Sequence, residues 1–234
     1  TPEMAIDPVA LAGVIERTVK AEPLIRVLTA HKVVSAKRLE GGFALEVETV
    51  DGKREMDAGP VVNCAWDGRP TLDQMILGKD QVANYRVKYS VTVRGGQAPK
   101  LRASTLAQGP FGDVVPWPGG GVYISWYPAA RTYFGDQPLE NLEADPGVAE
   151  RVHAAIQELF PALEDFRVDR YAPCYILADG RTDIGDRESR LHTRGGAEFV
   201  TSDGWWSIRS SKLTTAPLAG ERCAASITGI ESGF

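Results

Sequence analysis

The segment Ser210-Ser211-Lys212-Leu213-Thr214-Thr215 combines small polar residues and one lysine immediately before a predicted helix that runs through Ala224 and Ala225. The first turn of a helix offers unpaired backbone N–H groups and a partial positive charge, which suit an anion or an electron-rich carbonyl. In the plainer alternative, Thr214 or Thr215 only caps the helix, and the spacing alone does not decide between the two.

An arginine stands in the loop Asp179-Gly180-Arg181-Thr182-Asp183, where the glycine permits backbone angles that other residues avoid. The planar guanidinium matches the oxygens of a carboxylate or phosphate, so Arg181 is a candidate for binding an anionic ligand. The alternative is a solvated loop in which Arg181 pairs with Asp183 or Asp186. His192 follows in the chain and is a candidate proton acceptor or a structural hydrogen-bond donor.

A third segment, Asn63-Cys64-Ala65-Trp66-Asp67-Gly68, follows the apolar pair Val61-Val62, which predicts a short buried strand. Ligands bind at the carboxyl ends of strands in α/β arrangements, and small residues there let a planar group approach the backbone. The alternative is an ordinary exit from the strand, with Trp66 filling a core.

Motifs for several other chemistries are absent from the 234 residues. There is no G-x-x-x-x-G-K-[ST] loop, no H-E-x-x-H, no G-x-S-x-G and no G-x-G-x-x-G after a first strand. The cysteines are widely spaced and form no zinc-binding pattern, which favours reduced thiols in a cytoplasmic protein. A net charge of −5 gives no basic field for nucleic acid, and no apolar run reaches the ~20 residues that span a bilayer.

Helix and strand signals indicate which elements position these segments. Asp7-Pro8 and Asp145-Pro146 each place an N-cap before a proline, and they predict helices over 8–20 and from 146 to about 160. The expected strands and hairpins are Ile25–Leu28, Val33–Ala36, a hairpin that turns at Asp51-Gly52, Val61–Val62, Tyr85–Val93 with Arg86 and Lys88 facing solvent, a hairpin around Gly119–Gly121, and Tyr171–Leu177. This order predicts an α+β fold with a mixed, mainly antiparallel sheet and flanking helices.

Taken in order, these segments resemble the D-amino-acid oxidase superfamily of FAD-dependent oxidoreductases. Ser211-Lys212-Leu213-Thr214-Thr215, followed by Ala219-Gly220-Glu221, is similar to the G-K-L-T-T…A-E signature of its glycerol-3-phosphate dehydrogenase-type members. The other resemblances are Asp179-Gly180-Arg181 to the family's G-x-R element, Ser189-Arg190 to its S-R element, and Ala58 to Trp66 to the strand that leads into N-A-x-G or N-x-x-W. Ser210-Ser211 departs from the family's paired glycines.

The resemblance implies a role for each segment. Residues Ser211, Lys212, Leu213, Thr214 and Thr215 would lie at the pyrimidine edge of the flavin, where N–H groups stabilise negative charge as the ring is reduced. Arg181 and Lys212 would hold an anionic group of the substrate. The remaining cofactor contacts would come from Val33 and Val34 near the adenosine half, and from Asn63, Cys64, Ala65 and Trp66 beside the ring system.

The resemblance also divides the chain. Residues 1–80 would be the remnant of an FAD-binding α/β domain, 81–176 the substrate-binding domain, and 177–234 the return to the FAD-binding domain. The glycine-rich diphosphate loop and its ribose-binding acid are expected to precede Thr1 in the complete protein. FAD would therefore be the cofactor of the complete protein, and these residues alone are expected to be inactive.

The implied function is an FAD-dependent oxidoreductase that transfers a hydride from a small anionic amine or alcohol to the flavin. The alternatives are a cofactor-free module that binds anions through Arg181 and Lys212, and a structural remnant that associates with another chain. Without the front segment, apolar surface around Val33, Val61 and Val62 is expected to be uncovered and to promote homo-oligomers.

Overall fold

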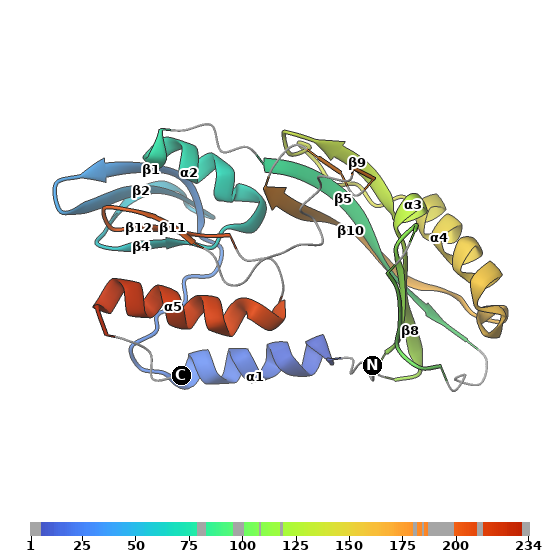
Figure 1. The fold of residues 1–234 in the computed structure, drawn as a ribbon. Helices are drawn as coiled ribbons and strands as arrows, with labels where there is room; N and C mark the ends of the chain where they lie inside the picture. Colours follow the sequence, from blue (N-terminus) through green and yellow to red (C-terminus); the bar gives the residue numbers. More distant parts are fainter. Residues whose placement is uncertain are drawn as a thin grey trace. The chain divides into compact units, whose positions relative to one another are not determined.

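The computed structural model describes residues 6–78, 83–95, 101–107, 109–117, 119–179, 182–183, 185–186, 199–209 and 213–230. The chain divides into two compact units: unit 1 comprises Thr1–Val27 and Tyr85–Ile176, and unit 2 comprises Leu28–Asn84 and Leu177–Phe234. Both units combine helices with mainly antiparallel sheets, which confirms the predicted α+β class (Figure 1). Among the described helices, none is both long and apolar enough to cross a membrane.

Unit 1 is built on a six-stranded sheet with the order β10-β5-β8-β7-β6, in which β9 also pairs with β5. Its strands are β5 (Ala83–Arg94), β6 (Ser104–Leu106), β7 (Gly112–Trp117), β8 (Gly121–Trp126), β9 (Arg131–Gly135) and β10 (Arg167–Asp179). Its helices are α1 (Pro8–Ala21), α3 (Tyr127–Ala130) and α4 (Pro146–Leu159), with the 3₁₀ turn η2 (Pro161–Leu163). The predicted hairpin around the three glycines is the β7-β8 pair, in which Trp117 lies opposite Gly121.

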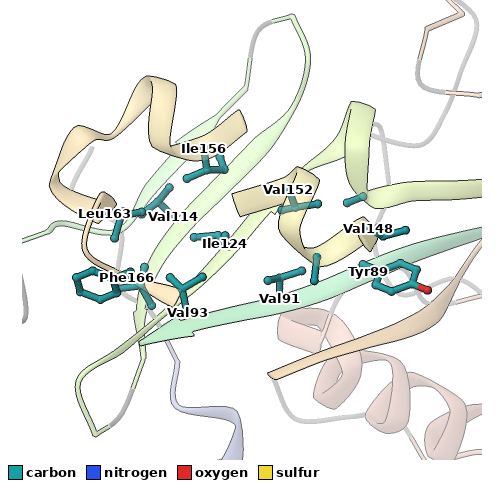
Figure 2. Packing of buried hydrophobic residues seen from close by; sticks show 13 residues of the cluster. Tyr89, Val91, Val93, Val114, Ile124, Val148, Val152, Ile156, Leu163 and Phe166 are labelled. Atoms are coloured by element: carbon teal, nitrogen blue, oxygen red, sulfur yellow. The ribbon is translucent and has the colours of Figure 1, made fainter. Parts of the chain in front are cut away.

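The core of unit 1 lies between this sheet and α4 (Figure 2). Val91 and Val93 of β5 pack there with Ile124 of β8, and the three side chains are completely buried. Val152 and Ile156 contribute the apolar face of α4 and are equally buried. Alternation in the strand and 3.6-residue periodicity in the helix thus bring the apolar residues of both elements onto one dry interface.

Helix α1 begins as the sequence predicts. The Asp7 carboxylate accepts hydrogen bonds from the backbone N–H groups of Val9 and Ala10, at 2.9 Å and 3.0 Å. None of the residues of this helix is buried, and Val14 and Ile15 are both 50% exposed. α1 is therefore ordered by its own capping and periodicity more than by burial within the described residues.

Two predictions about strands were wrong. Ile25–Leu28 forms no strand: the segment follows a turn at Pro23 and pairs with none of the described strands, and Ile25 is half exposed. Arg86 does not face solvent but is completely buried. Phe134 on β9 lies directly opposite Arg86, so the two side chains share one face of the sheet, and the guanidinium carbon lies 5.5 Å from the centre of the Phe134 ring.

Unit 2 contains two three-stranded sheets. The first is the antiparallel meander β1 (Lys32–Leu39), β2 (Gly42–Thr49) and β3 (Gly52–Ala58), and the second has the order β11 (Phe199–Ser202), β12 (Trp205–Ile208) and β4 (Val61–Asn63). Its helical elements are η1 (Trp66–Gly68), α2 (Arg69–Leu77), η3 (Leu213–Thr215) and α5 (Ala216–Thr228). The predicted turn at Asp51-Gly52 is confirmed, and Gly52 has the positive φ, 114°, that glycine tolerates best.

A helix lies on each face of the strand pair β12 and β4, as Figure 1 shows within unit 2. The indole N–H of Trp205 donates to Asp73 on α2 at 3.0 Å, whereas the indole N–H of Trp206 donates to Ser226 on α5 at 3.0 Å. Successive residues of a strand point to opposite faces, so these two tryptophans fix α2 on one face of the sheet and α5 on the other.

Candidate functional site

The candidate site lies where β4 and β12 end. These two strands run parallel, with Trp205 opposite Val61 and Ser207 opposite Asn63, so both carboxyl ends reach the same edge of the sheet. Such an edge is where open α/β sheets bind their ligands. The loop that begins at Cys64 leaves this edge from β4, and the chain leads from β12 toward α5.

Asn63 is buried, and its carboxamide is bonded within unit 2. The Nδ2 group donates to the Asp73 carboxylate at 2.8 Å and to the backbone oxygen of Arg69 at 3.1 Å. Its Oδ1 accepts from the backbone N–H of Ala65 at 3.1 Å. Both N–H groups of this amide are thus used inside the protein, so the side chain shapes the following loop.

Asp73 is the residue that sequence reasoning missed. Its carboxylate is completely buried and accepts hydrogen bonds from four side chains on three elements. One oxygen accepts from Asn63 at 2.8 Å and from Trp205 at 3.0 Å, and the other accepts from Arg69 at 3.2 Å and from Ser207 at 2.5 Å. A carboxylate has about four acceptor positions, so this set saturates it. A buried charge is tolerated only when it is paired and hydrogen-bonded in this way.

Arg69 supports the same cluster from the first turn of α2, where the helix dipole disfavours a positive charge. The guanidinium is nearly completely buried and pairs with Asp73 one turn later. The ion pair therefore explains the position of this arginine. The only sequence signal for it is the i, i+4 spacing of Arg69 and Asp73, which is also typical of exposed helix faces.

The loop after Asn63 combines exposed side chains with a strained backbone. Cys64, Ala65 and Trp66 are all exposed, and Trp66 has a φ of 47°. A bulky residue with positive φ is an outlier that costs on the order of 1–3 kcal/mol and often marks a functional site. The loop is held by the bond from Asn63 to Ala65 and by a 2.9 Å backbone bond from Gly68 to the Ala65 oxygen. Although the residue is exposed overall, the protein atoms around its sulfur partly desolvate the thiol, and this raises the pKa of Cys64 above its usual value.

The start of α5 is the second segment that the sequence predicts for the site. Leu213 and Thr214 are exposed, and Thr215 occupies the N-cap position, where its side chain makes no capping hydrogen bond to the helix. The structure therefore does not support the plainer interpretation of Thr215 as a cap. The 13-residue helix presents the positive end of its dipole at this point.

The remaining predicted residues lie on β1 or outside the described residues. Val33 packs against the buried cluster of Phe43 and Trp205, and Val34 lies at an irregularity in the pairing of β1 with β2. The residues Arg181, His192, Ser211 and Lys212 lie outside the described residues. No group of three or more histidine, cysteine, aspartate or glutamate side chains in the described ranges is arranged to hold a metal ion.

A model of the family described as "DAO: FAD dependent oxidoreductase" matches residues 1–226. The chain belongs to this family. Members are FAD-dependent oxidoreductases, and the match confirms the resemblance that the sequence motifs indicate. No curated protein matches the chain.

Several solved enzyme structures share the fold of this chain at low sequence identity. L-proline dehydrogenase from P. horikoshii is 14% identical, with a TM-score of 0.68 over 96% of this chain and 56% of that one. Glycine oxidase from Geobacillus kaustophilus is 14% identical, with a TM-score of 0.65 over 87% and 50% of the two chains. L-amino acid deaminase from Proteus vulgaris is 12% identical, with a TM-score of 0.63 over 90% and 56%. The chain thus spans about half the length of these proteins.

The described residues fit the ring portion of FAD better than its diphosphate. Cys64 and Ala65 place little side-chain bulk on an exposed loop, and Trp66 offers an exposed aromatic surface. The positive end of α5 suits the negative charge that develops on a reduced flavin. The diphosphate usually binds a glycine-rich loop at a helix N-terminus, and the sequence contains no G-x-G-x-x-G.

Proposed function

We propose that these residues form the ring-facing part and the substrate domain of an FAD-dependent oxidoreductase that acts on a small anionic amine or alcohol. The observation that carries the proposal is the strained, exposed loop Cys64–Trp66 at the carboxyl end of a strand parallel to β12. Family membership supports FAD as the cofactor. FAD supplies a hydride acceptor when it is bound.

The residues of this chain have distinct proposed roles. The Cys64–Trp66 loop would lie beside the ring, and the amides at the start of α5, from Ser211 to Thr215, would face its pyrimidine edge. Arg181 and Lys212 would bind the anionic group of the substrate and hold the reacting C–H bond toward the ring. The domain division at residues 1–80, 81–176 and 177–234 and the adenosine contacts of Val33 and Val34 belong to this proposal.

Anaerobic reduction of the flavin tests the proposal. The complete protein that contains these residues is purified with FAD and mixed with small amino, hydroxy and phosphorylated acids, while flavin absorbance is followed. We expect one of these classes to bleach the flavin band. Arg181→Ala should raise the substrate concentration needed for half-maximal reduction by about 10²-fold or more, because a charge-assisted bidentate contact is lost.

Arg170→Ala is the matched control, because this arginine side chain is 84% exposed on β10 and should leave the reduction unchanged. A complete protein that binds no flavin would contradict the oxidoreductase function. Saturable binding of an anion that Arg181→Ala abolishes would, in that case, identify the cofactor-free binding module.

We also propose that the 234 residues alone associate through apolar surface that includes Val62, which is 40% exposed on β4. Light scattering at increasing concentration tests this association. A monodisperse monomer at high concentration would contradict it, and Val62→Lys should reduce the associated fraction if the surface is correctly identified.

A further inference from the structure

We propose that Asp73 is a positioning residue for the candidate flavin site: through Asn63 it sets the backbone of the loop Cys64–Trp66. This inference rests on the proposed function for its significance. The contacts that carry it lie within unit 2 and involve no cofactor.

Two acceptors fix the orientation of the Asn63 amide. A carboxamide has one accepting and one donating end, and either end can face a given neighbour unless a partner selects between them. The Asp73 carboxylate can only accept, so it selects the Nδ2 group, which lies 2.8 Å from its oxygen. The backbone oxygen of Arg69, at 3.1 Å from Nδ2, selects in the same direction.

The opposite end of the amide then points toward the loop. Oδ1 of Asn63 accepts from the backbone N–H of Ala65 at 3.1 Å, and this bond spans the residue Cys64. Trp66 comes next, with its left-handed backbone angle. A strained conformation persists only where the surroundings hold it, and the Asp73–Asn63–Ala65 chain of hydrogen bonds begins in the core and ends next to the strained residue.

The two partners of Asp73 on β12 allow its effect on the loop to be distinguished from its effect on the stability of the buried cluster. Ser207 and Trp205 also donate to Asp73, but both are on β12 and neither is bonded to the loop in the hydrogen bonds described here. Ser207 uses the carboxylate oxygen that Asn63 does not use. Removing the Ser207 hydroxyl therefore weakens the buried cluster while leaving the Asn63 amide oriented.

The thiol of Cys64 reports on the loop without any flavin. Cys174→Ser and Cys223→Ala leave Cys64 as the sole cysteine, and its reaction with a chromogenic aromatic disulfide is timed at 25 °C. We expect Asp73→Asn and Asn63→Ala each to raise the rate about fivefold or more, because thiol reactivity follows access and thiolate fraction. Ser207→Ala should leave the rate within about twofold of the parent.

Far-UV circular dichroism selects the folded variants for comparison. If Asp73→Asn does not fold, the Cys64 rates of Asn63→Ala and Ser207→Ala are compared instead. Asn63→Ala breaks the chain of hydrogen bonds at the loop and keeps the Asp73 carboxylate. The positioning role would be overturned if the Cys64 rate were unchanged in every folded variant of Asp73 and Asn63. An equal increase of the rate in Ser207→Ala would overturn it as well.

A second measurement connects the loop to the cofactor. In the complete protein, we expect the dissociation constant for FAD, from quenching of flavin fluorescence, to rise about tenfold in Asp73→Asn and Asn63→Ala because the loop is displaced. Ser207→Ala should bind FAD like the parent. If the parent binds no FAD while the thiol pattern holds, the proposed function fails and the positioning role stands. If the parent binds FAD and the thiol pattern is absent, the positioning role alone fails.

Discussion

The hydrophobic core of unit 1 and the buried cluster around Asp73 in unit 2 differ in their chemistry. In unit 1, α4 packs on the sheet through aliphatic residues such as Val152, Ile156 and Ile124 (Figure 2). In unit 2, the apolar cluster is small, and the fully buried Trp205 bonds to the carboxylate of Asp73. Hydrophobic contacts are non-directional, whereas a buried carboxylate requires every partner in place. The unit with the candidate site is therefore the one whose geometry is specified by directed bonds.

Removing the carboxylate should give the largest loss of stability. Asp73→Ala leaves the Arg69 charge and the hydrogen-bond donors of Asn63, Trp205 and Ser207 buried without their acceptor. We expect the free energy of unfolding to fall by about 3–5 kcal/mol, the usual cost of breaking a buried ion pair. Urea denaturation followed by tryptophan fluorescence measures the loss.

The paired replacement Arg69→Met with Asp73→Leu is the control for charge. Exchanging both members of a buried ion pair for apolar residues is often nearly neutral, so this variant should be more stable than Asp73→Ala. If the double variant is as unstable as the single one, packing rather than the uncompensated charge determines the stability of unit 2.

Truncation of the aliphatic core should give a graded loss instead. Ile156→Ala in α4 should cost about 3 kcal/mol and Ile156→Val about 1 kcal/mol, because the loss follows the volume removed and the cavity left. Thermal and urea unfolding of the two variants measure this gradient. Equal losses for both would show that unit 1 is as intolerant of small changes as the network of unit 2, and the contrast between the units would disappear.

The same contrast explains what the sequence could predict. Local signals were sufficient for the helices that begin at Asp7-Pro8 and Asp145-Pro146, and for the turn at Asp51-Gly52. Alternation over Tyr85–Val93 correctly predicted β5. These features depend on residues within a few positions of one another, and their capping, turn and periodicity rules act along the chain.

The buried network could not be found in this way. Ser207 lies 134 positions after Asp73, and no pattern within α2 distinguishes its aspartate from a solvent-exposed one. The burial of Arg86 was missed for a related reason, because alternation along β5 does not reveal what packs over each face of the strand. For the candidate site, sequence motifs predicted Asn63 to Trp66, and that prediction stands untested; the hydrogen bonds that link Asn63 to Asp73 and to Ala65 depend on contacts between elements.

The loss of a helix cap should lower the stability of a whole unit only if the helix is buried in that unit, and two caps allow this smaller effect to be tested. Asp145 caps α4 by accepting from the N–H of Gly147 at 2.8 Å, and Asp7 caps α1 in the same manner. Asp145→Ala should lower the free energy of unfolding of unit 1 by about 1 kcal/mol. Asp7→Ala should only fray α1, none of whose residues is buried. Denaturation and hydrogen exchange distinguish these results, and equal global losses would contradict the difference.

The smallest expected effect is a pH dependence in unit 1, where a titratable residue lies in the otherwise apolar layer. Burial lowers the pKa of His153, although a hydrogen bond to the backbone of Leu163 and the nearby Glu150 oppose this shift. The unfolded chain therefore binds the proton more readily than the folded one between the lowered pKa and the ordinary value near 6.5. Stability rises with pH across that interval and is lost as the pH falls from about 7 toward 5.

His153→Gln should remove this part of the pH dependence while retaining a polar side chain. The difference in melting temperature between the parent and the variant at pH 8, where the imidazole is neutral in both states, gives the cost of the substitution itself. We expect the parent to lose more stability than the variant on acidification to pH 5. Parallel melting curves at both pH values would show that burial of His153 costs no proton-linked stability.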